Sequence, residues 1–226
     1  MPLDIEVLAD ADSVAERAAT FVAKQADAAV AERGRFSLAV SGGHTPWAMF
    51  AHLTGRVAWE RVTVYQVDER IAPDGDPDRN LTHLTASLPP GLGADIRPMP
   101  VDGQDLEGAA TIYARSLPER FDLVHLGLGP DGHTASLVPG DPVLDIDDRD
   151  VALTGVYQGR RRMTLTYPAL NRARRVLWLI TGADKVEALR RLRVGDRSIP
   201  AGRVETPSQL VIADEAAVPR GEVGAR

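Results

Sequence analysis

The sequence predicts an α/β fold of the Rossmann-like kind, in which helices flank both faces of a mostly parallel sheet. Apolar segments of strand length alternate with segments of helical periodicity along most of the 226 residues. Two of the strand-like segments, 36–40 and 121–126, run into glycine-rich loops, as strands do where an open parallel sheet binds a ligand. Because no internal repeat or break in composition is visible, we expect one domain over residues 1–226.

Each element is predicted from periodicity and from the residues that start or stop it. Proline suits the first turn of a helix, so one helix should begin at Pro46. Asn80, and either Asp12 or Ser13, are of the types that cap helices, and Gly34 should end the first one. The residues from 219 onward should form a loose tail. Strands are expected over 5–8, 36–40, 62–67, 121–126, 151–157, 162–167, 176–180 and 209–213, and helices over 13–33, 46–53, a short stretch from 80, 105–119 and about 181–194.

Composition excludes several classes of function. The net charge is −6 at pH 7, which gives no reason to expect nucleic acid or an anionic membrane as a partner. The chain has no cysteine, so it can form no disulfide, thiol nucleophile or cysteine metal site. No apolar run approaches the roughly 20 residues of a membrane span, and the N-terminus lacks signal-peptide features. We therefore expect a cytoplasmic protein, and a monomer is plausible.

The segment 41–46, Ser-Gly-Gly-His-Thr-Pro, is the first candidate binding loop. Gly42 and Gly43 let the backbone approach an anion, the helix that follows offers free N–H groups, and Ser41 and Thr45 add hydroxyl donors. It is neither a Walker A loop nor a dinucleotide fingerprint, because the Gly-Lys-Ser/Thr and the third glycine are missing. A phosphate site and a simple strand-to-helix turn are equally compatible with this pattern.

The run 127–139, Gly-Leu-Gly-Pro-Asp-Gly-His-Thr-Ala-Ser-Leu-Val-Pro, carries the candidate base. His133 can take a proton from water near neutral pH, and Asp131 could orient its ring. The competing interpretation is a capping Asp beside a surface His. His125 is eight residues away, which is not a metal-ligand spacing of the helical kind, so no metal is expected.

Charged side chains at three further positions could complete a site. Asp68-Glu69-Arg70 follows an apolar strand and would stand at the carboxyl edge of the sheet, although a solvated loop with an internal ion pair explains it as well. Arg162 and Lys185 could each reach a phosphate, Arg with a planar fork and Lys as a point charge. The alternative for these two is a charge run that serves solubility.

Together these stretches resemble the 6-phosphogluconolactonase family and the wider superfamily that includes glucosamine-6-phosphate isomerase/deaminase. The run 127–139 is the most specific, and the others are weak singly and strong jointly. The matching stretches span most of the chain and are 41–46, 68–70, 79–80, 127–139, 162–166 and 182–185.

The resemblance implies hydrolysis of 6-phospho-D-glucono-1,5-lactone, a phosphosugar lactone, to 6-phosphogluconate in the oxidative pentose phosphate pathway, without metal or organic cofactor. It implies that His133 is the base, that Asp68, Arg70 and Asp131 support it and position the substrate, and that Asn80 borders the sugar. The phosphate site that it implies consists of Ser41, Gly42, Gly43, Thr45, Arg162 and Lys185.

Two other functions remain open. The isomerase resemblance calls for a Glu five residues after the loop His, where this chain has Val138, which cannot transfer a proton. A catalytically silent sugar-phosphate sensor is the second alternative, although such sensors normally come fused to a DNA-binding segment, and no basic helix-turn-helix pattern is visible here. His44 departs from the small or polar residue usual in the family, and we expect it to face solvent.

Overall fold

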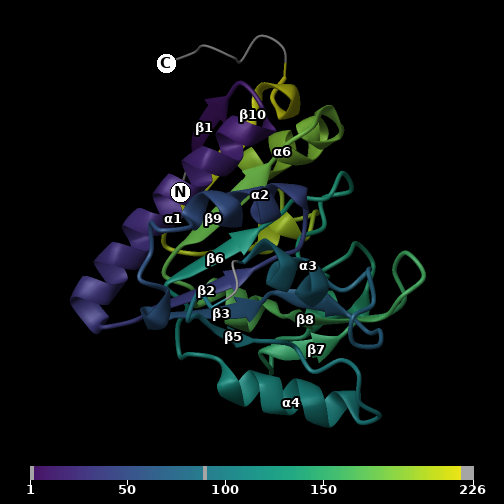
Figure 1. The fold of residues 1–226 in the computed structure, drawn as a ribbon. Coiled ribbons are helices and arrows are strands. Elements are labelled where there is room, and N and C mark those ends of the chain that lie inside the picture. The colour runs from purple at the N-terminus through teal and green to yellow at the C-terminus, as the bar shows by residue number, and fades with distance from the viewer. Residues whose placement is uncertain (1–2, 89–90, 220–226) are drawn as a thin grey trace.

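The computed structural model describes residues 3–88 and 91–219, so the tail expected from 219 lies almost wholly outside the described residues. Its centre is a seven-stranded sheet in which every pair of neighbours is parallel (Figure 1). In spatial order the strands are β1 (Asp4–Leu8), β10 (Gln209–Asp214), β9 (Val176–Ile180), β6 (Leu123–Leu126), β2 (Phe36–Val40), β3 (Val62–Gln66) and β5 (Asp95–Arg97). The predicted mostly parallel sheet is therefore confirmed, and β5 is a strand that the sequence did not predict.

A second, three-stranded antiparallel sheet in the order β4-β8-β7 lies beside the first. Its strands are β4 (Asp68–Arg70), β8 (Arg162–Leu165) and β7 (Val151–Leu153). Val67 joins the two sheets, because its N–H bonds to Val40 O while its carbonyl accepts from Leu165 N–H. The predicted strands 151–157 and 162–167 were too long. The first ends at Leu153 because the hairpin turn follows it, and the second ends at Leu165 because Thr166 caps α5.

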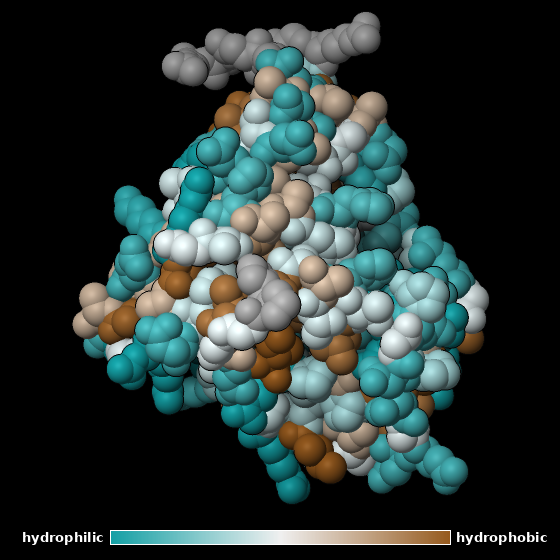
Figure 2. Space-filling view, in the orientation of Figure 1, coloured by the Kyte–Doolittle hydropathy of each residue, from teal (hydrophilic) through white to brown (hydrophobic). Residues whose placement is uncertain are grey.

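Helices cover both faces of the parallel sheet, as predicted. One core lies under α1 (Ala11–Arg33), α2 (His44–Leu53) and α3 (Asn80–Ser87). The other lies under α4 (Leu106–Ser116), α5 (Tyr167–Asn171) and α6 (Val186–Arg193). None of the helices in the described part of the chain combines the length and apolar character that a bilayer crossing requires. On the face that Figure 2 shows, hydrophilic side chains predominate and hydrophobic ones form small, separate groups.

The capping predictions need two corrections. Asp10, not Asp12 or Ser13, caps α1, and its carboxylate accepts from Ser13 N–H at 2.8 Å. Asn80 is the first residue inside α3 rather than its cap, because the buried Glu69 carboxylate bonds the Asn80 and Leu81 N–H groups that a cap would satisfy. Gly34 ends α1 in the left-handed conformation, as expected.

Strand order fixes where a ligand can bind. From β2 the chain builds outward through β3 and β5, whereas β6, β9 and β10 extend the sheet in the opposite direction. Adjacent β2 and β6 are therefore the switch point, and in open α/β sheets the ligand crevice lies at the carboxyl ends of such strands. The loops that leave these two ends are 41–43 and 127–139, the two candidate loops of the sequence.

Candidate active site

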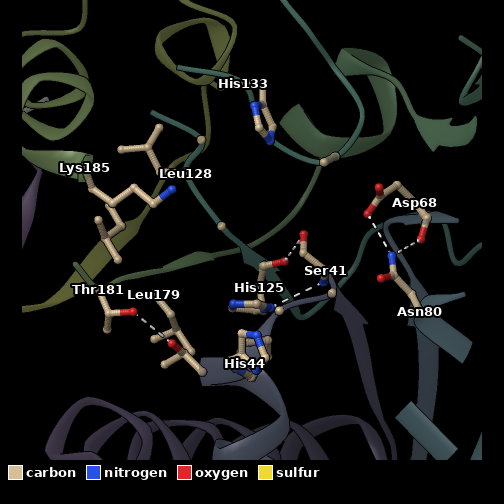
Figure 3. A pocket seen from close by; sticks show the side chains of 18 of the residues that line it. Ser41, His44, Asp68, Asn80, His125, Leu128, His133, Leu179, Thr181 and Lys185 are labelled. Atoms are coloured by element: carbon tan, nitrogen blue, oxygen red, sulfur yellow. Dashed lines mark hydrogen bonds between the residues drawn. The ribbon is translucent and has the colours of Figure 1, made fainter. Parts of the chain in front are cut away.

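A cleft of about 440 Å³ opens at the carboxyl ends of β2, β6 and β9 (Figure 3). Every residue that the sequence predicts for the site, except Asp131, lines this cleft. The predicted residues in its lining are Ser41, Gly42, Gly43, Thr45, Asp68, Arg70, Asn80, His133, Arg162 and Lys185. The structure thus brings together residues that are up to 144 positions apart, from Ser41 to Lys185 (185 minus 41).

His133 and Asp131 form a hydrogen-bonded pair at one wall of the cleft. The His133 Nδ1–H donates to Asp131 Oδ1 at 2.6 Å, and the His133 backbone N–H donates to the same oxygen at 3.1 Å. With Nδ1 as donor, Nε2 of the neutral ring carries the lone pair that could take a proton. The His133 side chain is 22% exposed, so water can reach it. Burial raises the pKa of Asp131, but the bonds and positive charge of His133 outweigh burial and hold that pKa below its usual value.

Gly129 explains why the loop must be glycine-rich beside this pair. Its N–H bonds to the His133 carbonyl at 2.8 Å, which folds the loop back on itself. A Cβ at Gly129 would overlap the Nδ1 and Cε1 atoms of His133. Only glycine therefore lets the imidazole lie against the backbone in its observed orientation.

The loop after β2 forms a second wall. α2 begins here, with Gly43 as its N-cap residue, so the free N–H groups of its first turn lie beside the cleft. A hydrogen bond of 3.0 Å between the Thr45 and Thr181 hydroxyls joins this loop to the end of β9. Lys185 lies on the same side of the cleft and pairs with Asp184 at 2.8 Å (Figure 3). These groups can bind an anion.

The antiparallel sheet supplies the opposite wall. Arg70 on β4 donates a hydrogen bond to Asn80 Oδ1, and Asn80 Nδ2 donates to the Asp68 carbonyl at 2.9 Å. Arg162, on β8, is 5% exposed, and its Nε has no partner among the residues that the structure describes. Burial lowers the pKa of Arg162, and the nearby Asp68 carboxylate acts in the opposite direction. This wall therefore carries two arginines beside the Asp68 carboxylate, and the unpartnered Nε of Arg162 is buried.

The interpretation of Asp68-Glu69-Arg70 as a solvated loop is wrong. Asp68 is 6% exposed and Glu69 is fully buried, because the three residues form strand β4. Asp68 Oδ2 accepts a 2.6 Å hydrogen bond from Ser136 Oγ, and Oδ1 accepts a longer one of 3.5 Å from Asn80. One of these partners, Ser136, lies in the same loop as His133, and the support of His133 by Asp68 stays a prediction.

Several side chains at or beside the cleft were not predicted from the sequence. Thr181, His125 and Gln158 also line the cleft, and Ser136 and Tyr157 contact its acidic residues. The Thr-Gly dipeptide after β9 was a usable signal for Thr181, because it sits at another strand end. His44 is exposed, as expected, and it also lines the cleft. Across the described residues, no three His, Cys, Asp or Glu side chains gather as a metal site would need.

His125 lies under the loop after β2. Its backbone carbonyl accepts from the Ser41 hydroxyl at 3.2 Å, and its Nδ1 accepts from the Ser41 N–H at 3.3 Å (Figure 3). The Nε2 atom is buried and has no partner in the part of the chain described. Burial lowers the pKa of His125 to about 3, so this ring is neutral and cannot be the titrating base of the site.

Comparison with known proteins identifies the family. The family model described as glucosamine-6-phosphate isomerases/6-phosphogluconolactonase matches residues 9–213. The chain is 34% identical to a 6-phosphogluconolactonase of Synechocystis over an alignment of 231 positions, which covers 93% of this chain and 95% of that protein. The crystal structure of a 6-phosphogluconolactonase from Shewanella baltica matches with a TM-score of 0.85 at 25% identity, covering 94% of this chain and 97% of that one.

A monomeric glucosamine-6-phosphate deaminase of the NagB superfamily matches almost as closely in shape. Its TM-score is 0.84 at 18% identity, covering 95% of this chain and 98% of that one. The shared fold therefore extends across both activities, and the side chains in the cleft must distinguish them. The match to the family model over residues 9–213 and the curated relative show that the chain belongs to the family of glucosamine-6-phosphate isomerases and 6-phosphogluconolactonases.

Proposed function

We propose that this protein hydrolyses 6-phospho-D-glucono-1,5-lactone to 6-phosphogluconate, with His133 as the general base. The observation that carries the proposal is the His133–Asp131 pair at the wall of a cleft lined by anion-binding groups. The names of the relatives point the same way, because the Synechocystis and Shewanella baltica proteins are called 6-phosphogluconolactonases.

The proposed reaction needs one positioned base and no covalent nucleophile. A water molecule attacks the lactone carbonyl carbon, and its proton passes to Nε2 of His133. The carbonyl oxygen becomes an oxyanion, which hydrogen-bond donors must stabilise. When the tetrahedral intermediate collapses, the bond between the carbon and the ring oxygen breaks, and the ring oxygen takes a proton that His133 can return. Asp131 stabilises the imidazolium that exists between these two transfers.

The phosphate group of the substrate would anchor it in the cleft, away from the reacting carbon. Ser41, Gly42, Gly43 and Thr45 would provide N–H and hydroxyl donors, and Arg162 and Lys185 would provide the charge. Binding energy gained at this remote group can orient the carbonyl against the water that His133 activates. Asn80, with Asp68 and Arg70, would contact the sugar between the two ends.

Aminosugar isomerisation is the second candidate, favoured by the structural likeness to a glucosamine-6-phosphate deaminase and by a family model that covers both activities. That reaction would need an acid at position 138 to open the sugar ring. Val138 is buried, at 8% exposed, and its side chain has no proton to give. A non-catalytic sugar-phosphate sensor is the third candidate. The hydrogen-bonded pair of His133 and Asp131 disfavours it, because a sensor needs no general base.

The test is acid release from freshly prepared 6-phosphogluconolactone, measured against spontaneous hydrolysis. We expect the wild-type protein to exceed the background rate and His133→Ala to lose most of that excess. Calorimetric binding of 6-phosphogluconate should survive in His133→Ala, because the phosphate site is intact. A wild-type rate equal to background would exclude the lactonase, and turnover of glucosamine 6-phosphate in its place would favour the isomerase.

We also propose that the protein acts in the cytoplasm as a monomer and binds no nucleic acid. The net charge of −6 supports the last point, because binding to a phosphate backbone usually needs a basic surface. Sedimentation of the purified protein tests the monomer directly.

A further inference from the structure

Tyr157 lies at the end of the hairpin that joins β7 to β8. Its backbone N–H and carbonyl both bond to Arg160, at 3.0 and 3.3 Å. The two residues between them, Gln158 and Gly159, have φ values of 52° and 80°. Positive φ at both central residues is what a tight two-residue hairpin turn requires, and Gln158 adopts it despite its side chain. The backbone thus fixes Tyr157 opposite Arg160, where its side chain reaches the cleft residues.

The Tyr157 side chain touches three residues of the site. Its hydroxyl donates to Asp131 Oδ2 at 3.4 Å, the oxygen that His133 leaves free. Its ring meets the His133 ring edge to face, with the centroids 5.4 Å apart and the planes at 66°. The Arg162 guanidinium carbon lies 4.9 Å from the Tyr157 ring centroid.

These contacts join two parts of the cleft that otherwise come from different segments of the chain. His133 and Asp131 belong to the loop after β6, whereas Arg162 belongs to β8. A cation over an aromatic ring is attracted within about 6 Å, and this attraction grows as the cation is desolvated, as Arg162 is. Burial and the nearby Asp131 carboxylate also raise the pKa of Tyr157, which keeps its hydroxyl protonated as a donor.

We propose that Tyr157 is a positioning residue of the reaction, whose hydroxyl orients Asp131 and whose ring holds the Arg162 guanidinium. It touches no reacting atom, and it sets the distance between the base and one of the cations that bind the substrate. This inference rests on the proposed lactone hydrolysis. In this inference the Tyr157 hydroxyl supports proton transfer through Asp131, and the Tyr157 ring supports substrate binding through Arg162.

Two substitutions separate these two roles. Tyr157→Phe removes only the hydroxyl, so we expect kcat to fall about fivefold, the effect of losing one ordinary hydrogen bond, while KM changes by less than about twofold. Tyr157→Leu also removes the ring, so KM should rise about fivefold in addition. If Tyr157 had a purely structural role, the two substitutions would lower the melting temperature. They would not affect kcat and KM separately in this way. Val156→Ala, at an exposed neighbour in the same hairpin, is the matched control and should behave as wild type.

A second measurement does not depend on turnover. In the wild type, the ¹⁵N signals of the neutral His133 ring should report protonated Nδ1 and unprotonated Nε2, and Tyr157→Phe should shift them toward the other tautomer. Binding of 6-phosphogluconate should weaken in Tyr157→Leu and not in Tyr157→Phe. If the wild type lacks lactonase activity, the proposed function fails while these two readouts still test Tyr157. Wild-type kcat and ring signals in Tyr157→Phe, or equal KM in both variants, would overturn the inference.

Discussion

One oxygen of Asp131 accepts two hydrogen bonds from His133, at 3.1 Å from its backbone N–H and 2.6 Å from its ring Nδ1–H. The carboxylate therefore fixes the loop and the imidazole together. Because Nδ1 is committed as a donor, the free lone pair is on Nε2, and His133 is presented to the cleft in the tautomer that a general base needs.

Asp131→Asn should weaken catalysis more than binding. An amide at this position can offer its N–H₂ group to Nδ1, which would favour the tautomer with the proton on Nε2. We expect kcat to fall on the order of 10- to 100-fold while KM for the lactone changes little, since the residue does not line the cleft. Steady-state kinetics on fresh lactone measures both constants. A variant with wild-type kcat would show that the tautomer is not set by Asp131.

Two glycines of the same loop make a matched pair for testing the position of His133, the proposed base. A methyl group at Gly129 would overlap the His133 ring, whereas one at Gly127 has no other atom within 4 Å. Gly129→Ala should lower kcat on the order of 100-fold, the usual effect of displacing a catalytic group by about 1 Å. Gly127→Ala should lower it far less. Equal losses in the two variants would mean that the loop responds to any added side chain.

The parallel sheet could be predicted because its signals are local. Strands such as β2 and β9 are short apolar runs buried on both faces, and the loops at their ends carry glycine and helix-starting residues. In the antiparallel sheet, β7 and β8 lie within predicted strands, whereas β4 could not be predicted in the same way. β4 has the sequence Asp-Glu-Arg, and it is buried only because partners distant in sequence, Asn80 and Ser136 among them, satisfy its charges.

The site residues also divide into those with a local signal in the sequence and those placed by contacts between distant segments. His133, Ser41 and Lys185 follow strand ends, so their common location followed from the geometry of a parallel sheet. Tyr157 could not be found, because only the hairpin turn and the packing against Arg162 bring it to the loop after β6. No spacing in the sequence encodes such a contact.

Glu69 should matter for stability. Its carboxylate is fully buried and accepts hydrogen bonds of 2.7 to 2.8 Å from Gln66, Arg70, Asn80 and Leu81, and Arg79 lies 3.6 Å away. Glu69→Gln replaces one acceptor oxygen with a donor that faces other donors and removes the charge beside buried Arg79. We expect the free energy of unfolding to fall by about 3 kcal/mol, measured by urea denaturation.

The control for Glu69→Gln is Asp148→Asn. Asp148 also pairs with an arginine, Arg149, but both side chains are exposed. Exposed pairs contribute little, so this variant should unfold at nearly the same urea concentration as the wild type. A similar small change for Glu69→Gln would mean that water, rather than the carboxylate, satisfies the donors around β4.

His125 should make the fold sensitive to mild acid. Its pKa is about 3 in the folded protein and about 6.5 in the unfolded chain, so the unfolded state binds more protons between these values. The stabilisation is complete above pH 6.5 and is lost as the pH falls toward 3. From pH 7 to pH 5 this one group should remove about 2 kcal/mol from the free energy of unfolding. His125→Leu, which cannot titrate, should lose about 2 kcal/mol less over the same interval. A His125→Leu variant that kept the wild-type dependence would show that burial does not hold His125 neutral.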